Sequence, residues 1–148
     1  MISDWVLPDI EDSDTAPFWV AASERRLVVQ KCDSCRELRF PPQPFCGRCR
    51  HATASWVPVS GRGRIWSYVI VHAPILPAYE PFLPYPVVVI ELEEDKRLRM
   101  VGNLVADQRS PINSVDSSSL RIGLPVQVVF QVIARDIVLP RWRLIEAG

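Results

Sequence analysis

Four cysteines, the only ones in this chain of 148 residues, are spaced as two matched pairs. Cys32 and Cys35 form one C-x-x-C turn, and Cys46 and Cys49 form a second turn after ten intervening residues. Two such turns complete the tetrahedral S4 shell that zinc takes in closed structural sites. Iron in a rubredoxin-like site uses the same four sulfurs, and a ribbon that has lost its metal keeps the spacing. The spacing therefore predicts a metal ribbon holding structural zinc, with those two alternatives left open.

Other roles for paired cysteines fit this chain less well. A disulfide framework needs an oxidising compartment, and residues 1–5 lack the basic start and apolar run of a signal peptide. A thioredoxin-type redox pair accounts for one C-x-x-C turn but gives the second turn no role. No apolar stretch approaches the roughly 20 residues of a transmembrane helix. We therefore expect a cytoplasmic protein that makes no membrane contact.

The residues around the cysteines indicate how the two turns are positioned. The apolar run 27–29 leads into the first turn, and Phe40-Pro41-Pro42 separates the pairs. Gly47 lies inside the second turn, where we expect a positive φ. Upstream of the ribbon, Asp14 or Thr15 is a candidate cap for a short helix with proline in its first turn.

The whole chain predicts a mainly β fold. Fourteen prolines against six glycines favour short strands and rigid connections over long helices. Downstream of the ribbon, alternating apolar and polar residues predict strands at 63–72, 86–93, 97–105, 125–132 and 137–145, which suit a Greek-key barrel of the OB type. The predicted parts are an acidic segment with a short helix at 1–24, a rubredoxin-like zinc ribbon at 25–60 and a five-stranded OB-fold domain at 61–148.

The first barrel strand is apolar on both of its predicted faces. Strict alternation places Ile65, Val69 and Val71 on one face, which we expect to be core. The other face then carries Trp66, Tyr68, Ile70 and His72. Such an aromatic face is expected either to be covered by the ribbon or a partner, or to bind a ligand.

Charge is distributed unevenly, although the formal net charge is zero. Residues 1–24 hold six acids and no base, and residues 25–64 hold nine bases and two acids. Fifteen of the seventeen bases are arginine, which suits bidentate contacts with phosphate or carboxylate. The basic stretch is either a solvated face or a patch for a phosphorylated ligand or an acidic partner.

An ordered series of motifs over about residues 15–130 resembles the DUF35 family, whose members combine an OB fold with a rubredoxin-like zinc ribbon. The matching motifs are Pro17-Phe18-Trp19, both cysteine pairs, Phe40-Pro41-Pro42, Trp56, Ser60-Gly61-Arg62-Gly63, Tyr68-Val69-Ile70-Val71-His72, Pro84-Tyr85-Pro86 and Ile122-Gly123-Leu124-Pro125-Val126. The sequence departs from the family at Glu94-Asp95-Lys96, where the family has a glycine. This difference concerns the conformation of one hairpin turn only. The resemblance implies an accessory subunit of thiolase-superfamily enzymes, including acyltransferases and lipid-transfer-type aldolases, or of enoyl-CoA hydratases.

The chemistry of the residues agrees with a subunit that is not an enzyme by itself. All four thiols are assigned to metal, and the two histidines belong to no nucleophile motif. Gly61-Arg62-Gly63 is too short for a phosphate-binding loop. A closed S4 site also leaves no open coordination position for catalysis.

The function predicted from the resemblance is to bind acyl-CoA and shape the substrate channel of a thiolase-like partner, in a two-plus-two heterotetramer. Candidate CoA-binding residues are Arg48, Arg50, Arg62, Arg64, Trp66, Tyr68 and Tyr85. Candidate partner-interface residues are Phe18, Trp19, Trp66, Tyr68 and Ile70. For each of these aromatic residues, packing within the chain is the alternative.

Two other functions remain as alternatives. OB barrels bind single-stranded nucleic acid through aromatic platforms in a basic groove, but zero net charge and the acidic N-terminal segment argue against that role. We therefore expect no nucleic-acid partner. An electron carrier would need iron in the ribbon.

Overall fold

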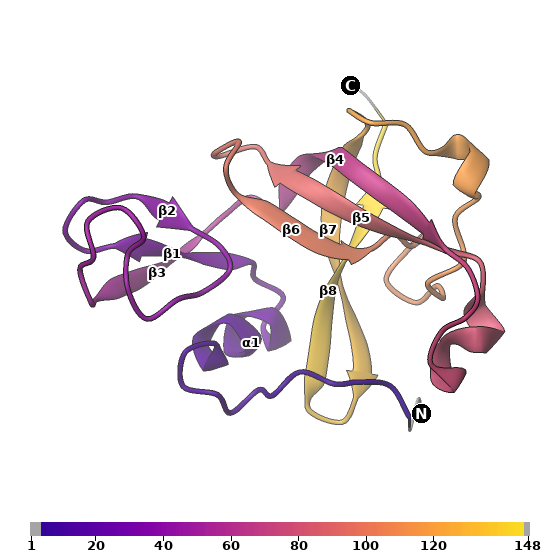
Figure 1. Ribbon diagram of the computed structural model, residues 1–148, viewed down its shortest axis with the longest axis horizontal. Helices are drawn as coiled ribbons and strands as arrows, with labels where there is room; N and C mark the ends of the chain where they lie inside the picture. Colours follow the sequence, from indigo (N-terminus) through magenta and orange to yellow (C-terminus); the bar gives the residue numbers. More distant parts are fainter. Residues whose placement is uncertain (1–3, 147–148) are drawn as a thin grey trace.

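The computed structural model describes residues 4–146 and has a mainly β fold with one α-helix, as predicted. Figure 1 shows a small ribbon sheet on one side, a larger barrel on the other, and the helix below the gap between them. The elements are α1 (Ala16–Ser23), β1 (Val28–Cys32), β2 (Leu38–Arg39), β3 (Ala54–Pro58), β4 (Arg62–Val71), the 3-10 helix η1 (Pro77–Phe82), β5 (Tyr85–Leu92), β6 (Arg99–Asn103), the 3-10 helix η2 (Ser117–Ser119), β7 (Pro125–Ala134) and β8 (Ile137–Leu144). The described residues include no helix long and apolar enough to cross a membrane.

Helix α1 begins at Ala16, with Pro17 in its first turn as predicted. Thr15 occupies the N-cap position, but its side chain makes no capping hydrogen bond. Instead, the carbonyl oxygen of Asp12 accepts hydrogen bonds from the backbone N–H groups of Thr15 and Ala16. The helix buries Phe18, Ala21 and Ala22. Its packing therefore holds the ribbon and the barrel to a common core.

The ribbon is a three-stranded antiparallel sheet in the order β2-β1-β3. Cys32 ends β1 and pairs with Ala54 at the start of β3, so the first cysteine turn begins at the end of the central strand. The barrel is a five-stranded sheet in the order β6-β5-β4-β7-β8, and every ladder is antiparallel. The division of the chain after residues 24 and 60 stays a prediction.

Within residues 4–146, the barrel closes at one point only. Leu104 forms a parallel bridge with Trp142, and the Val105 N–H donates to the Trp142 carbonyl oxygen at 2.8 Å. Elsewhere the free edges of β6 and β8 face each other without pairing among the described residues. The result is the partly open barrel typical of the OB fold.

The predicted alternation of β4 is wrong beyond Ile65. The pairing of β4 with β5 shifts between Ile65 and Ser67, so Trp66 is the extra residue of a β-bulge. One extra residue reverses every side chain that follows. Ile70 therefore packs on the core cluster, as does Tyr68, whereas Val69 is 59% exposed.

The acidic N-terminal segment packs against the barrel. Trp5 is buried and stacks on Tyr79, with ring centroids 5.0 Å apart, and its edge meets Phe82. These residues belong to a second hydrophobic cluster with Tyr85 and Ile112. The segment is thus anchored at its start as well as at α1.

Candidate metal centre and apolar groove

The structure brings the four predicted metal ligands together. One sulfur each from Cys32, Cys35, Cys46 and Cys49 lies within 4.8 Å of the other three. The closest pairs join sulfurs of different turns, because both Cys32 to Cys49 and Cys35 to Cys46 measure 3.6 Å. All four are free thiols. Four sulfurs converging from two turns fit a tetrahedral thiolate-bound metal.

The two cysteine turns have the same backbone geometry. The N–H of Arg36 donates to the Cys32 carbonyl oxygen at 3.0 Å, and that of Arg50 donates to the Cys46 carbonyl oxygen at 2.9 Å. Both arginines have φ at 64°, in the left-handed region. The prediction of a positive φ at Gly47 is wrong, because the left-handed residue follows the second cysteine of each pair.

Backbone N–H groups are directed at the sulfurs. Those of Cys49 and Arg48 donate to Cys46 and lower the pKa of its thiol to about 6. The N–H of Glu37 donates to Cys35, which by itself lowers the pKa of that thiol. Burial and the neighbouring thiols outweigh this hydrogen bond and raise the pKa of Cys35 to about 11. An N–H-rich shell favours thiolate, the form that binds metal.

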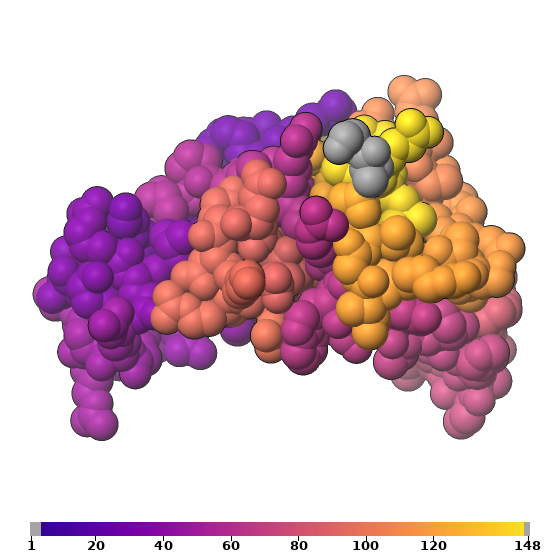
Figure 2. Space-filling model, turned by 90° about the horizontal axis from the view of Figure 1, so that it is seen from above, coloured from indigo at the N-terminus to yellow at the C-terminus, as the bar shows by residue number. Residues whose placement is uncertain are grey.

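Glu37 connects the metal centre to the barrel. Its carboxylate forms ion pairs with Arg97, in the turn between β5 and β6, and with Arg48 at 3.5 Å. Arg97 also pairs with Asp95 at 2.8 Å, and its hydrogen bond lowers the pKa of the Asp95 carboxyl. In Figure 2 the β5–β6 turn, in salmon, lies against the ribbon. We call this set of residues the ribbon–barrel clamp.

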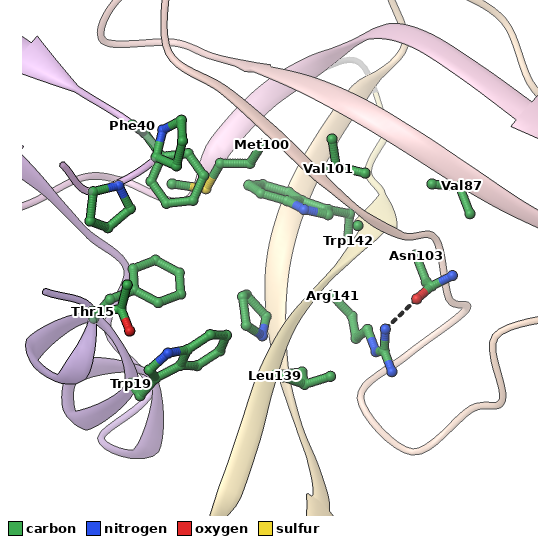
Figure 3. A pocket seen from close by; sticks show the side chains of 15 residues that line it. Thr15, Trp19, Phe40, Val87, Met100, Val101, Asn103, Leu139, Arg141 and Trp142 are labelled. Carbon is green, nitrogen blue, oxygen red and sulfur yellow. Dashed lines mark hydrogen bonds between the residues drawn. The ribbon is translucent and has the colours of Figure 1, made fainter. Parts of the chain in front are cut away.

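An apolar groove of about 490 Å³ lies where helix, ribbon and barrel meet. Its walls come from α1, from the segment between the cysteine pairs, and from β6 and β8 (Figure 3). The lining residues include Trp19, Phe40, Pro41, Met100, Val101, Leu139 and Trp142. Because these residues are spread from Thr15 to Trp142, sequence patterns gave no sign of the groove.

Arg141 is the charged residue that lines this groove. It is 5% exposed, and its guanidinium donates to the side-chain oxygens of Asn103 and Gln131 (Figure 3). No ion pair joins Arg141 to a carboxylate among residues 4–146. Burial lowers the pKa of Arg141 to about 10. The groove therefore contains a cation that is desolvated and has no counter-charge.

The candidate CoA-binding residues do not form one cluster. Arg62, Arg64 and Trp66 project outward from β4 at alternate positions, and both arginines line a hollow of about 870 Å³ with Lys96 and Arg143. Three glutamates line the same hollow, Glu91, Glu93 and Glu146. Arg48 lines a different hollow beside the ribbon, and Arg50 is exposed in the second cysteine turn. Tyr85 is buried in the second cluster, which leaves it no surface for a ligand.

The candidate partner-interface residues are also divided. Phe18 is 5% exposed and packs against Phe40 in the core, and it lines the apolar groove from that buried position. The bulge turns Tyr68 and Ile70 toward the core. Trp66 is 45% exposed, with the guanidinium of Arg99 lying 3.7 Å from its ring centre. Trp19 is half-buried and lines the apolar groove.

Comparison with known proteins identifies both halves of the chain. The rubredoxin-like zinc ribbon domain of ChsH2 matches residues 19–54, and the C-terminal OB-fold domain of ChsH2 matches residues 56–131. The chain is 36% identical over 130 residues to the probable enoyl-CoA hydratase alpha subunit of Thermomonospora curvata, which covers 88% of this chain but only 37% of that protein.

Two further relatives match along most of their own length. The DUF35 domain-containing scaffold protein of Methanocaldococcus jannaschii is 29% identical over 130 residues, covering 86% of this chain and 84% of that protein. In the solved structure of the Ltp2-ChsH2(DUF35) aldolase, a chain with 34% identity superimposes with a TM-score of 0.78, covering 93% of this chain and 98% of that one. With a sulfur-lined ribbon joined to an OB barrel and both ChsH2 domains matched in order, this chain belongs to the DUF35 family, in its ChsH2 type.

Proposed function

We propose that this chain is a non-catalytic accessory subunit that assembles with a thiolase-superfamily enzyme and helps to shape its acyl-CoA channel. The observation that carries the proposal is the end-to-end similarity to a chain of the Ltp2-ChsH2(DUF35) aldolase, with a TM-score of 0.78. The match covers 93% of this chain, so it includes both the ribbon and the barrel.

The chemistry of the described residues supports a subunit without its own active centre. The four thiols converge on one another, so none stands beside a base as a free nucleophile. His51 contacts the hydroxyl of Thr53, and both His51 and His72 are exposed. We propose that the sulfur cluster holds structural zinc, which would fix the two cysteine turns to each other.

For the ligand, we propose that the outward row on β4 meets acyl-CoA. Arg62 and Arg64 offer guanidinium groups for phosphate, and Trp66, which is 45% exposed, offers a heteroaromatic ring the indole face that Arg99 does not cover. Arg64 already donates to the Gly123 carbonyl oxygen at 2.9 Å, which holds its side chain along the strand. Zero net charge supports a phosphorylated small molecule over a nucleic-acid strand.

A second candidate function is an accessory part of an enoyl-CoA hydratase. The relative from Thermomonospora curvata is named a probable hydratase alpha subunit, and this chain spans 37% of its length. The remainder of that subunit has no counterpart among the 148 residues here. Under this alternative, the partner would be a hydratase subunit.

Co-expression tests both candidates. The tagged chain should co-purify with an Ltp2-type subunit of the same genome, with a hydratase-type subunit serving as the competing partner. Acyl-CoA turnover is measured for the chain, for the partner and for the complex, and mass under native conditions gives the stoichiometry, which we propose is two-plus-two. Turnover by the chain alone at the rate of the complex would refute an accessory role.

Trp19→Ala refines this test, because Trp19 lies on the groove wall and its loss should weaken assembly by about 2 kcal/mol. The metal content of the variant should not change. Phe45→Ala is the matched control, since Phe45 is an exposed aromatic residue of the ribbon outside the groove.

A further inference from the structure

The apolar groove is the open seam of the barrel. Residues 100–103 of β6 line one side of it and residues 139–142 of β8 line the other. Each of these strands pairs along its length with one neighbour only, β6 with β5 and β8 with β7. Pro140, which has no N–H to donate, lies on the unpaired edge, as prolines in sheets commonly do. Open edges of this kind are usually covered by another segment.

An apolar surface continues from the groove onto the outer face of the sheet. Two rows of side chains cross strands β4, β5 and β6. One row is Val69, Val87 and Asn103, and the other is Ser67, Val89 and Val101. We call them the valine rows. Val101 is 71% exposed and Val69 is 59% exposed. The 3-10 helix η1 and Trp5 cover only the Tyr85 end of this face, where Val87 also packs against their cluster. Because the opposite face of β5 already fills the core, this strand is apolar on both sides.

Arg141 adds a specific chemical requirement to this surface. A buried guanidinium ordinarily has a carboxylate partner, because desolvation of an unpaired charge costs several kcal/mol. Here its acceptors are the neutral side chains of Asn103 and Gln131. The Trp5 ring lies 5.6 Å from the guanidinium, and no carboxylate of the described residues pairs with it, so an anion supplied from outside would find an unpaired positive charge here.

We propose that the groove and the valine rows form one docking surface for the enzyme subunit, which inserts an apolar segment bearing an aspartate or glutamate that pairs with Arg141. The inference rests on the proposed function, because it names the surface through which that assembly forms. The valine rows span three strands beside the groove, and a protein can cover both, whereas a small acid would fill the groove alone.

The test compares variants of the chain in complex with the Ltp2-type subunit. Val101→Glu places a charge on the apolar rim, and Arg141→Met removes the buried charge while keeping apolar bulk. We expect Val101→Glu to weaken the complex at least about tenfold and Arg141→Met at least about thirtyfold. The matched controls are Val132→Glu, at a valine on β7 that is 65% exposed, and Arg135→Met, at an exposed arginine. Neither control residue lines the groove.

The melting temperature of the isolated chain is a second measurement. It separates a role of Arg141 in binding the partner from a role in holding the fold of this chain. Loss of the unpaired buried charge should offset the loss of the hydrogen bonds to Asn103 and Gln131, so the melting temperature of Arg141→Met should stay near that of the original chain while the complex weakens. If Arg141→Met does not fold, the docking surface is tested by comparing the affinity of Val101→Glu for the enzyme subunit with that of its control Val132→Glu.

The possible outcomes separate the two proposals. A complex that tolerates both variants as well as the controls would overturn the docking surface and leave the accessory role intact. Failure of the unaltered chain to bind either enzyme subunit would overturn both. Two results would overturn the choice of occupant: self-association of the isolated chain that Val101→Glu abolishes, or binding of a fatty acid that Arg141→Met abolishes without affecting the complex.

Discussion

Gly61, which lies between the ribbon strand β3 and the barrel strand β4, combines a left-handed backbone conformation with a very close side-chain neighbour. Its φ is +74°, and a Cβ atom added there would lie 2.3 Å from Cγ1 of Val128. The left-handed conformation costs about 1–2 kcal/mol for a residue with a side chain. Overpacking against a neighbouring strand adds about 1–3 kcal/mol. We therefore predict that Gly61→Ala lowers the free energy of unfolding by about 2–5 kcal/mol.

Gly123→Ala is the matched control. Gly123 has φ at +92°, but nothing lies within 4 Å of the position of its Cβ atom. This variant should lose only the backbone contribution of about 1–2 kcal/mol. The difference between the two variants therefore measures the contact with Val128.

Urea unfolding followed by tryptophan fluorescence is the assay, with excess zinc present so that metal loading is equal in all variants. The double variant Gly61→Ala/Val128→Ala should be more stable than the sum of its single changes predicts, because Val128→Ala removes the atom that clashes. Equal losses for Gly61→Ala and Gly123→Ala, or strict additivity in the double variant, would refute the packing argument.

Three further predictions concern the metal centre, the clamp and acid sensitivity. Cys46→Ser should release the metal and lower the melting temperature, as measured by native mass spectrometry and calorimetry, and full retention of both would contradict the four-sulfur site. Glu37→Gln should weaken the clamp by about 1 kcal/mol or less, because Arg97 and Arg48 are largely exposed, and hydrogen exchange should rise at the β5–β6 turn. The backbone N–H of Ser118 donates to Asp116 and holds the pKa of that carboxyl below its ordinary value of 3.8, so its stabilisation is present above pH 3.8 and is lost as the pH falls through the lowered value. Asp116→Ala should thus be less stable than the original chain at neutral pH, and urea titrations at decreasing pH should show the difference disappearing.

Features encoded by short-range spacing were predictable from the sequence. The cysteine cluster follows from two local turns, and the strands follow from alternation that each segment carries by itself. The bulge at Trp66 did not follow, because its position depends on how β4 pairs with β5. That single residue decided which of Tyr68 and Val69 reached the surface.

The groove and the buried charge of Arg141 could not be predicted from sequence patterns, for a related reason. Arg141 stands in an alternating strand where an arginine ordinarily faces solvent, and it is buried because Trp5 packs near it, with 5.6 Å between its guanidinium and the indole ring centre. Phe18 was a candidate for the partner interface, and sequence patterns could not show that Phe40 lies against it in the fold. In each instance the deciding contact joins residues that are distant in sequence.

The segment between the two cysteine pairs belongs to the metal centre and to the groove at once. Cys35 and Cys46 hold its ends, and Phe40, Pro41 and Pro42 form part of the groove wall. A chain without metal would lose the anchor at both ends of that wall, so the groove would lose its shape even if the barrel stayed folded. Metal loading would then act as a maturation checkpoint, and the number of subunits able to assemble in a cell would follow the supply of the ion.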